Sequence, residues 1–233
     1  MMGHPAWPEW LERLIQPNVL FPLWLTAKTV MLTIPLHLAV GLGLGAYLAN
    51  NRAPLRGFVE MAVTLPLVFP PVAIGFALLL LLGRKSVVGG WLWDSFGIEV
   101  IFSFWGVALA AFISGLPLIV RPVQSAIRSF PARMVEAALV LGKTRFQAFF
   151  LVVLPNIRRT VIAGLILAFG RSLGEVGITL MLGGNILGRT NTLSLEIYNA
   201  VSNGEFESAL TLSVVLGAVS ALILLALKRL DAL

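Results

Sequence analysis

The sequence contains no cysteine, which excludes a disulfide scaffold, a thiolate metal site and a cysteine nucleophile. Charged residues are scarce as well, making up 12% of the 233 residues against 58% hydrophobic ones. A soluble domain is about 25% charged and about 45–50% apolar. A soluble fold of this length could not bury so much apolar surface, and the mean hydropathy of +0.92 indicates that lipid covers part of it.

The amino-terminal residues lack the basic segment and apolar core of a cleavable signal peptide. Residues 1–16 are polar and rich in Trp and Pro, and the segment Leu11–Lys28 has an amphipathic pattern. Because Trp side chains favour the membrane–water interface, we expect residues 1–23 to lie along the outer interface. The transmembrane domain is then expected to occupy residues 24–230.

Five stretches are long and apolar enough to cross a bilayer as helices, which takes about 20 residues each. Backbone hydrogen bonding must be satisfied internally in hydrocarbon, so the sequence predicts an all-α integral membrane protein. The five stretches are Thr29–Asn51, Met61–Gly83, Val100–Val120, about Asn156–Leu182, and Ser208–Leu227.

Lysine and arginine are unevenly distributed among the connections. Of the 17 such residues, eleven fall on one side of the five spans and six on the other. Because cytoplasmic loops carry an excess of Lys and Arg, the richer side is predicted to be cytoplasmic. With five spans, the amino terminus is then expected outside and the carboxyl terminus in the cytoplasm. The pI near 10.5 therefore reflects topology and does not indicate a nucleic-acid partner.

The longest cytoplasmic connection, about residues 121–158, carries a pattern of fixed spacing. The pattern consists of Glu136, Ala137, Ala138, Gly142, Leu154 and Pro155. Met134, Ala138 and Leu141 are spaced to share a helical face, and Gly142 is placed to end that helix. A second apolar patch begins at Phe146. Such a short helix–turn–helix cannot bury both patches by itself, so we expect a partner surface.

This pattern resembles the EAA loop of binding-protein-dependent ABC importers, with Val152 where that family usually has isoleucine. In the family, the loop forms a coupling helix that docks in a groove of a cytoplasmic ATPase. The resemblance implies the type I ABC importer transmembrane fold, and a role for the six loop residues in transmitting nucleotide-driven closure. The alternative is an amphipathic helix that rests on lipid headgroups.

The same loop contains an incomplete nucleotide-binding motif. Gly142-Lys143-Thr144 resembles the end of a P-loop, but Ala137 stands where the motif requires its first glycine. We therefore expect no cofactor on this chain, no bond chemistry, and ATP with Mg²⁺ on a separate subunit.

Two of the predicted spans are irregular. The second contains Pro66, Pro70 and Pro71, which remove backbone donors and kink or break a helix; we interpret this as a hinge or gate, with a static kink as the alternative. The fourth must continue past Arg171 and Glu175 to about residue 182 if it is to cross. At i,i+4 spacing these two charges would face each other. Such a pair suits either a structural ion pair or the translocation path.

The residues after the fourth span are too polar to cross and too apolar for a free loop. They include Gly183, Gly184 and Asn185, and we expect them to fold back at the outer mouth, where glycine amides could line an anion route. Ser172, before Glu175, is included among the candidate pathway residues.

Three motifs are similar to those of molybdate importer permeases, over about residues 24–229. They are the stretch from Leu65 to Val72, the stretch from Ser172 to Gly177, and Gly183-Gly184-Asn185-Ile186. The resemblance implies a homodimeric permease in a prokaryotic inner membrane. Its expected partners are two copies of an ATPase and a periplasmic or lipid-anchored oxyanion-binding protein. Tungstate, sulfate and thiosulfate permeases are related alternatives, and an ion-gradient-driven secondary transporter is an alternative of another class.

Overall fold

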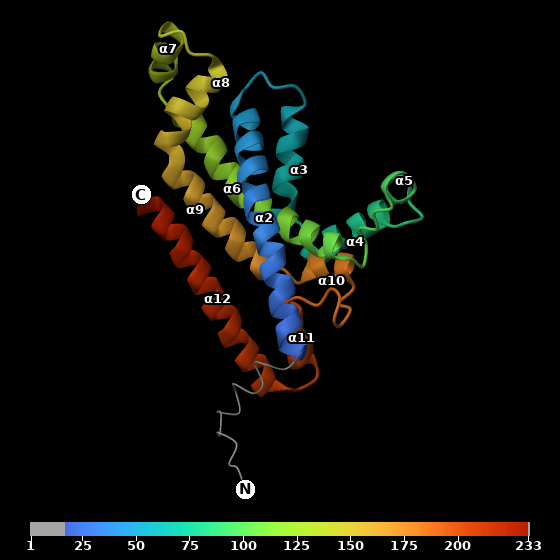
Figure 1. Ribbon diagram of the computed structural model, residues 1–233. Helices are drawn as coiled ribbons and strands as arrows, with labels where there is room; N and C mark the ends of the chain where they lie inside the picture. The colour runs from blue at the N-terminus through green and yellow to red at the C-terminus, as the bar shows by residue number, and fades with distance from the viewer. Residues whose placement is uncertain (1–16, 233) are drawn as a thin grey trace. The chain divides into compact units, whose positions relative to one another are not determined.

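The computed structural model describes residues 17–232, which are helical apart from short connections. Figure 1 shows the order of the helices along the chain. They are α2 (Pro17–Ala49), α3 (Arg56–Val68), α4 (Pro71–Leu82), α5 (Val87–Phe96), α6 (Phe104–Ser129), α7 (Ala132–Val140), α8 (Arg145–Ala148), the π-helical turn η1 (Phe149–Val153), α9 (Leu154–Leu173), α10 (Gly177–Gly183), α11 (Leu193–Ser202) and α12 (Phe206–Ala232).

Several of these helices can cross a membrane. Within residues 17–232, four are long and apolar enough: α2, α6, the continuous stretch Arg145–Leu173, and α12. A fifth span results if α4 and α5, which are bent by 55° to each other, are counted as one. The predicted all-helical membrane architecture is therefore confirmed, with four to five spans.

The chain divides into two compact units, each with its own packing. Unit 1 comprises residues 17–33, 70–111 and 172–222, and unit 2 comprises 34–69, 112–171 and 223–232 within the described chain. In unit 1, a small core of five buried residues joins the start of α2 to α11 and α12. Its members are Val19, Leu193, Ala200, Ala209 and Leu212.

Small residues allow close helix packing in both units. A Cβ added at Gly41 of α2 would lie 2.6 Å from the Ile119 side chain of α6, within unit 2. In unit 1, a Cβ at Gly75 of α4 would lie 3.0 Å from the Cα of Ile178 in α10, and Figure 1 shows these two helices side by side. Lipid tails provide no hydrophobic drive for helix association, so such close backbone contact is a main source of stability.

The second predicted span is broken, as the prolines predict. α3 ends at Val68 and α4 begins at Pro71, with Pro70 as its N-cap. A proline at the start of a helix is well tolerated, because the missing N–H would have no partner there. Met61–Gly83 is therefore not one continuous helix, and α4 is instead followed by α5 across a bend.

The predicted course of the fourth span is wrong at its carboxyl end. α9 ends at Leu173, and residues 174–176 are not helical before α10 begins. The length needed for crossing comes from the other end, because helix extends without a gap from Arg145, giving 29 residues. This corresponds to about 44 Å, more than the hydrocarbon thickness of about 30 Å. Arg171 lies in α9 and Glu175 in the non-helical break, so their predicted pairing cannot follow from i,i+4 spacing on one helix and stays a prediction.

The first span begins earlier than its apolar stretch suggests. Residues 17–28 belong to the same continuous helix as the rest of α2. Residues 1–16, the other part of the predicted interfacial segment, lie outside the described residues. The interfacial position of residues 1–23 stays a prediction.

Candidate functional site

The end of α7 is built around Gly142. Its φ of 78° is left-handed, a conformation that L side chains rarely adopt. The Lys143 amide donates to Ala138 O at 3.0 Å, and the Gly142 amide donates to Leu139 O at 2.9 Å. These two bonds are the Schellman motif that closes many helices. The predicted helix end at Gly142 is confirmed.

The next helix begins directly after this turn. The Thr144 hydroxyl accepts from the Gln147 amide, and the Gln147 side chain accepts from the Thr144 amide. This reciprocal capping box satisfies two donors at the helix start. The loop between α7 and α8 is therefore fixed at both ends by local hydrogen bonds.

The loop leaves much of its apolar surface exposed. Val140, Leu141 and Phe146 are 87%, 79% and 73% exposed. Met134, Ala138 and Leu141 were expected to share one helical face. They differ in burial, because Ala138 is buried while Met134 and Leu141 are exposed. Glu136 and Ala137 lie on the exposed side.

Leu154 and Pro155 lie where the π turn joins α9. The Leu154 amide donates to Phe149 O, which is an i→i−5 bond. Pro155 has no N–H to continue an α-helical ladder. The Asn156 side chain donates to Val152 O at 2.7 Å and so satisfies a carbonyl beside this junction. The motif's final pair thus sets the geometry by which the loop enters the membrane helix.

The break after α9 is held by buried polar side chains in unit 1. The Ser172 hydroxyl donates to Ala111 O on α6 at 2.7 Å. The Glu175 carboxylate, 2% exposed, accepts from the Ile178 amide at 2.7 Å and so starts α10. The Thr26 hydroxyl of α2 accepts from the Leu193 amide at 2.9 Å. Ser172 and Glu175 therefore lie together in a hydroxyl-rich region, and their role in a translocation path stays a prediction.

This polar region encloses a cavity of about 20 Å³. That volume suits a single water molecule, which needs roughly 10–15 Å³. The polar residues that line the cavity are Thr26, Thr29, Thr33, Ser172, Glu175, Thr179 and Thr192. The cavity is too small for a tetrahedral oxyanion in this conformation.

The glycines at and after the end of α10 take part in local backbone packing. Gly184 has a φ of 73°, and a Cβ there would lie 2.5 Å from the Phe102 ring. Its amide donates to Leu180 O at 3.0 Å, and the Gly188 amide donates to Asn191 Oδ1 at 2.9 Å. These two amides therefore have acceptors within the chain, and the anion route along Gly183, Gly184 and Asn185 stays a prediction.

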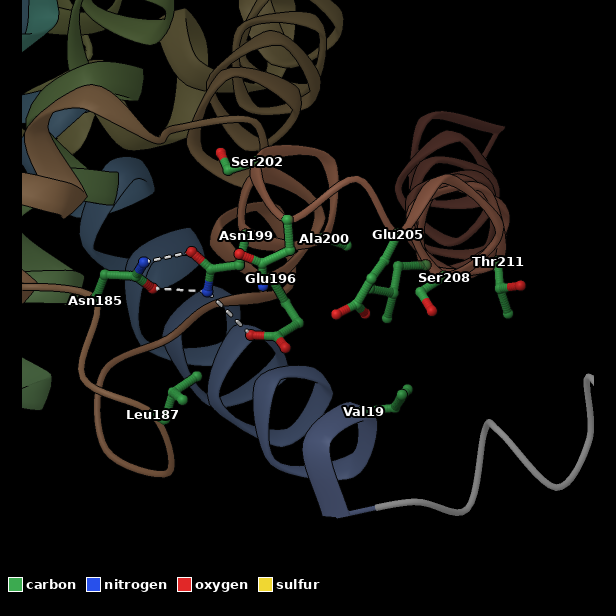
Figure 2. Close-up of a pocket in the computed structure, with 12 residues that line it drawn as sticks. Val19, Asn185, Leu187, Glu196, Asn199, Ala200, Ser202, Glu205, Ser208 and Thr211 are labelled. Atoms are coloured by element: carbon green, nitrogen blue, oxygen red, sulfur yellow. Dashed lines mark hydrogen bonds between the residues drawn. The ribbon is translucent and has the colours of Figure 1, made fainter.

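Asn185 belongs to a polar pocket of about 420 Å³ that the sequence did not reveal. Figure 2 shows its side chain joined to Asn199, which in turn meets Glu196. Glu205, the residue directly before α12, lies across the pocket (Figure 2). None of the lining residues is Lys or Arg. The pocket therefore does not suit a dianion, and no group of three or more metal-ligating side chains occurs within residues 17–232.

Comparison with known proteins gives the family. Residues 41–232 match the family described as binding-protein-dependent transport system inner membrane component. The molybdenum transport system permease protein ModB of Escherichia coli K12 is 34% identical over 220 residues, which cover 93% of this chain and 92% of that protein. The sulfate transport system permease protein CysW of Synechocystis is 32% identical over 226 residues, covering 97% and 81%.

Solved structures support the same fold. A bacterial alginate ABC transporter in complex with an alginate pentasaccharide-bound periplasmic protein matches with a TM-score of 0.74 at 17% identity, covering 97% of this chain and 83% of that one. The chain therefore belongs to the binding-protein-dependent transport system inner membrane components, and is an ABC transporter permease of the inner membrane.

Proposed function

We propose that this permease forms the gated passage for molybdate in an ATP-driven importer. The observation that carries the proposal is the alignment with ModB of Escherichia coli, which extends over nearly the full length of both chains. ModB of Azotobacter vinelandii is 36% identical over 186 residues, covering 79% of this chain and 82% of that one. The proposal assigns the capture of the anion to a separate binding protein outside the membrane.

The proposed partners are two ATPase subunits, one oxyanion-binding protein and a second copy of this chain. The exposed apolar side chains around Leu141 and Phe146 support an ATPase contact, because a short loop with this much exposed apolar surface needs a cover. In this scheme Glu136, Ala137 and Gly142 contact the ATPase. ATP binding draws the two ATPases together and moves the loops, and hydrolysis resets them.

The proposed pathway elements are the break between α3 and α4 and the polar region around Ser172. Pro66, Pro70 and Pro71 interrupt the backbone ladder, which makes this connection a candidate hinge. Ser172 and Glu175 place polar atoms in the interior of unit 1. Intramembrane polar groups of this kind commonly mark a transport path.

Uptake of radiolabelled molybdate tests the proposal. Cells that express the permease with its ATPase and binding protein are expected to accumulate molybdate, and a variant ATPase that cannot hydrolyse ATP abolishes the accumulation. Uptake that persists without a functional ATPase would instead indicate a gradient-driven transporter.

Sulfate is the second candidate cargo, because sulfate permeases align over an even larger share of this chain. CysT of Escherichia coli K12 is 30% identical over 230 residues, which cover 99% of this chain and 83% of that protein. Unlabelled sulfate, thiosulfate and tungstate are therefore included as competitors. If sulfate competes as well as molybdate does, the molybdate assignment is wrong and the permease is a sulfate-type one.

A further inference from the structure

Unit 2 contains a charged cluster that the proposed function does not use. Arg121 of α6 donates to Glu60 of α3, with Nη1 and Oε1 2.6 Å apart. The same guanidinium donates to Gln124 Oε1 at 3.4 Å and to the Thr64 hydroxyl. The Arg121 guanidinium beside Glu60 holds the pKa of that carboxyl below its usual value. The Glu60 carboxyl is therefore ionised near neutral pH.

A second arginine lies two turns further along α6. Arg128 donates to Leu48 O, the carbonyl in the last turn of α2, at 3.1 Å. Residues 121, 125, 128 and 129 follow one another at spacings of four, three and one, so they share one face of the helix. This face lies at the end of α6 that the Lys and Arg distribution assigns to the cytoplasm.

The shared face forms one wall of an open pocket of about 540 Å³. The pocket is lined by Glu60, Arg121, Gln124, Ser125, Arg128 and Ser129. Two guanidinium groups and two hydroxyls are donors typical of sites for tetrahedral oxyanions, because a guanidinium presents paired N–H groups to two oxygens at once. The lining carries a net charge of +1 from two arginines and one glutamate.

The two arginines retain hydrogen-bonding capacity. A guanidinium has five N–H donors. Within residues 17–232, Arg121 uses three contacts to protein acceptors and Arg128 uses one. The remaining N–H groups are available to a ligand in the pocket.

Glu60 limits the strength of this site. Its carboxylate already forms an ion pair with the Arg121 guanidinium, and its negative charge repels any second anion that approaches the same guanidinium. A dianion that reaches the pocket must compete with it. The arrangement therefore suits weak, reversible binding, which an anion in transit requires, and does not suit tight storage.

We propose that the pocket between α3 and α6 binds a tetrahedral oxyanion, held by Arg121, Arg128 and Ser125, with Glu60 as a built-in competitor. This goes beyond the proposed function, since it concerns a site on the permease itself and does not depend on which oxyanion is the cargo. Two sources supply this chemistry at a membrane surface: a free dianion such as sulfate or molybdate, and the phosphate of a lipid headgroup.

Equilibrium binding to the purified permease–ATPase complex tests the site, without the external binding protein. Radiolabelled sulfate and molybdate are measured separately in detergent at low ionic strength. Arg128→Gln is expected to weaken binding about tenfold or more, as loss of a charged hydrogen bond predicts. Glu60→Gln is expected to tighten it by about threefold to tenfold, since a competing charge is removed. A purely structural ion pair would give no such tightening.

Matched variants separate the site from general charge and folding effects. Arg52→Gln removes the same charge from an exposed turn of unit 2 and is expected to leave binding unchanged. Ser125→Ala changes one exposed hydroxyl and is expected to weaken binding about threefold while the complex keeps its thermal stability. Added salt is expected to weaken wild-type binding, because exposed charges are screened.

A lipid arm distinguishes the two sources. The complex is reconstituted in vesicles of phosphatidylcholine with or without phosphatidylglycerol, and lipid that co-purifies is counted. If binding of sulfate or molybdate depends on Arg128, the ligand of the site is the free dianion. If only the enrichment of phosphatidylglycerol depends on Arg128, and no dianion binds, the ligand is the headgroup phosphate. If neither ligand depends on Arg128, or if Glu60→Gln weakens dianion binding, the proposal is wrong. Molybdate uptake by the wild-type permease is measured in parallel. If the variants show no oxyanion site but uptake occurs, only the site proposal is wrong. If the site binds oxyanion but uptake does not occur, only the transport proposal is wrong.

Discussion

Gly142 offers the sharpest test of the proposed ATPase contact at the loop between α7 and α8, because the need for glycine at this position can be traced to the backbone conformation alone. Its φ is 78°, and no atom lies within 4 Å of a Cβ added there. Gly142→Ala therefore introduces no clash, and its main cost is the left-handed conformation, about 1–2 kcal/mol for a residue with a Cβ. A change of that size lowers the population of the closed helix end about 5- to 30-fold.

Gly142→Asn is the matched control. Asparagine tolerates the left-handed region better than other residues with a Cβ. It is also larger than alanine, so any steric requirement at the ATPase contact affects it more. If the backbone conformation is what matters, Asn is expected to keep most of the activity and Ala to lose most of it.

The assay is ATP-driven molybdate uptake into proteoliposomes that contain the permease, its ATPase and its binding protein. The amount of ATPase that co-purifies with each variant is measured alongside. We expect both quantities to fall in the order wild type, Asn, Ala. The opposite order, with Ala close to wild type and Asn severely impaired, would refute the backbone argument and indicate that free space at the contact is the requirement.

Three further predictions concern packing and charge. Gly75→Ala is expected to lower the melting temperature, because its Cβ would lie 3.0 Å from the backbone of α10; Gly43→Ala, with nothing within 4 Å, is expected not to. Thermal unfolding in detergent measures both, and equal losses would contradict the packing argument. Ser172→Ala removes a buried hydroxyl bond to α6 and is expected to cost about 1 kcal/mol in the free energy of unfolding. A loss of uptake without that loss of stability would instead indicate a direct role in transport. The ion pair of Glu60 with Arg121 depresses the pKa of the carboxyl, so its stabilisation is complete above the ordinary pKa and is lost as pH falls through the folded value. Glu60→Gln is therefore expected to flatten the loss of stability between about pH 5 and pH 3, and identical pH profiles would argue against the pair.

The sequence was sufficient for the features that depend on composition and local chemistry. Helical spans follow from apolar length, the break near Pro70 from missing donors, and the end of α7 from Gly142. These predictions hold because each depends on neighbouring residues alone.

The sequence was not sufficient where a tertiary contact decides the outcome. The fourth span was expected to run through Glu175, but its carboxylate accepts from the Ile178 amide and starts a new helix. The amide of Gly184 likewise has an acceptor within α10. The pocket around Asn185 and Asn199 was not predicted either, since its walls come from segments far apart in the chain. The relevant signal was present as clustered Asn, Ser and Glu residues, but spacing alone could not bring them together.

The π turn at Phe149–Val153 affects the direction in which the loop between α7 and α8 faces. A π turn contains about one residue more than an α turn, and one residue corresponds to about 100° of rotation around a helix. The phenyl rings of Phe146 and Phe150, whose centroids are 4.6 Å apart, are thus set at an angle to α9 that no uninterrupted α-helix would give them. Deleting a single residue in this turn would keep the helix and the composition intact while turning that aromatic pair away from its original direction. The π turn therefore determines the angle around the α9 axis at which the loop between α7 and α8 leaves the helix.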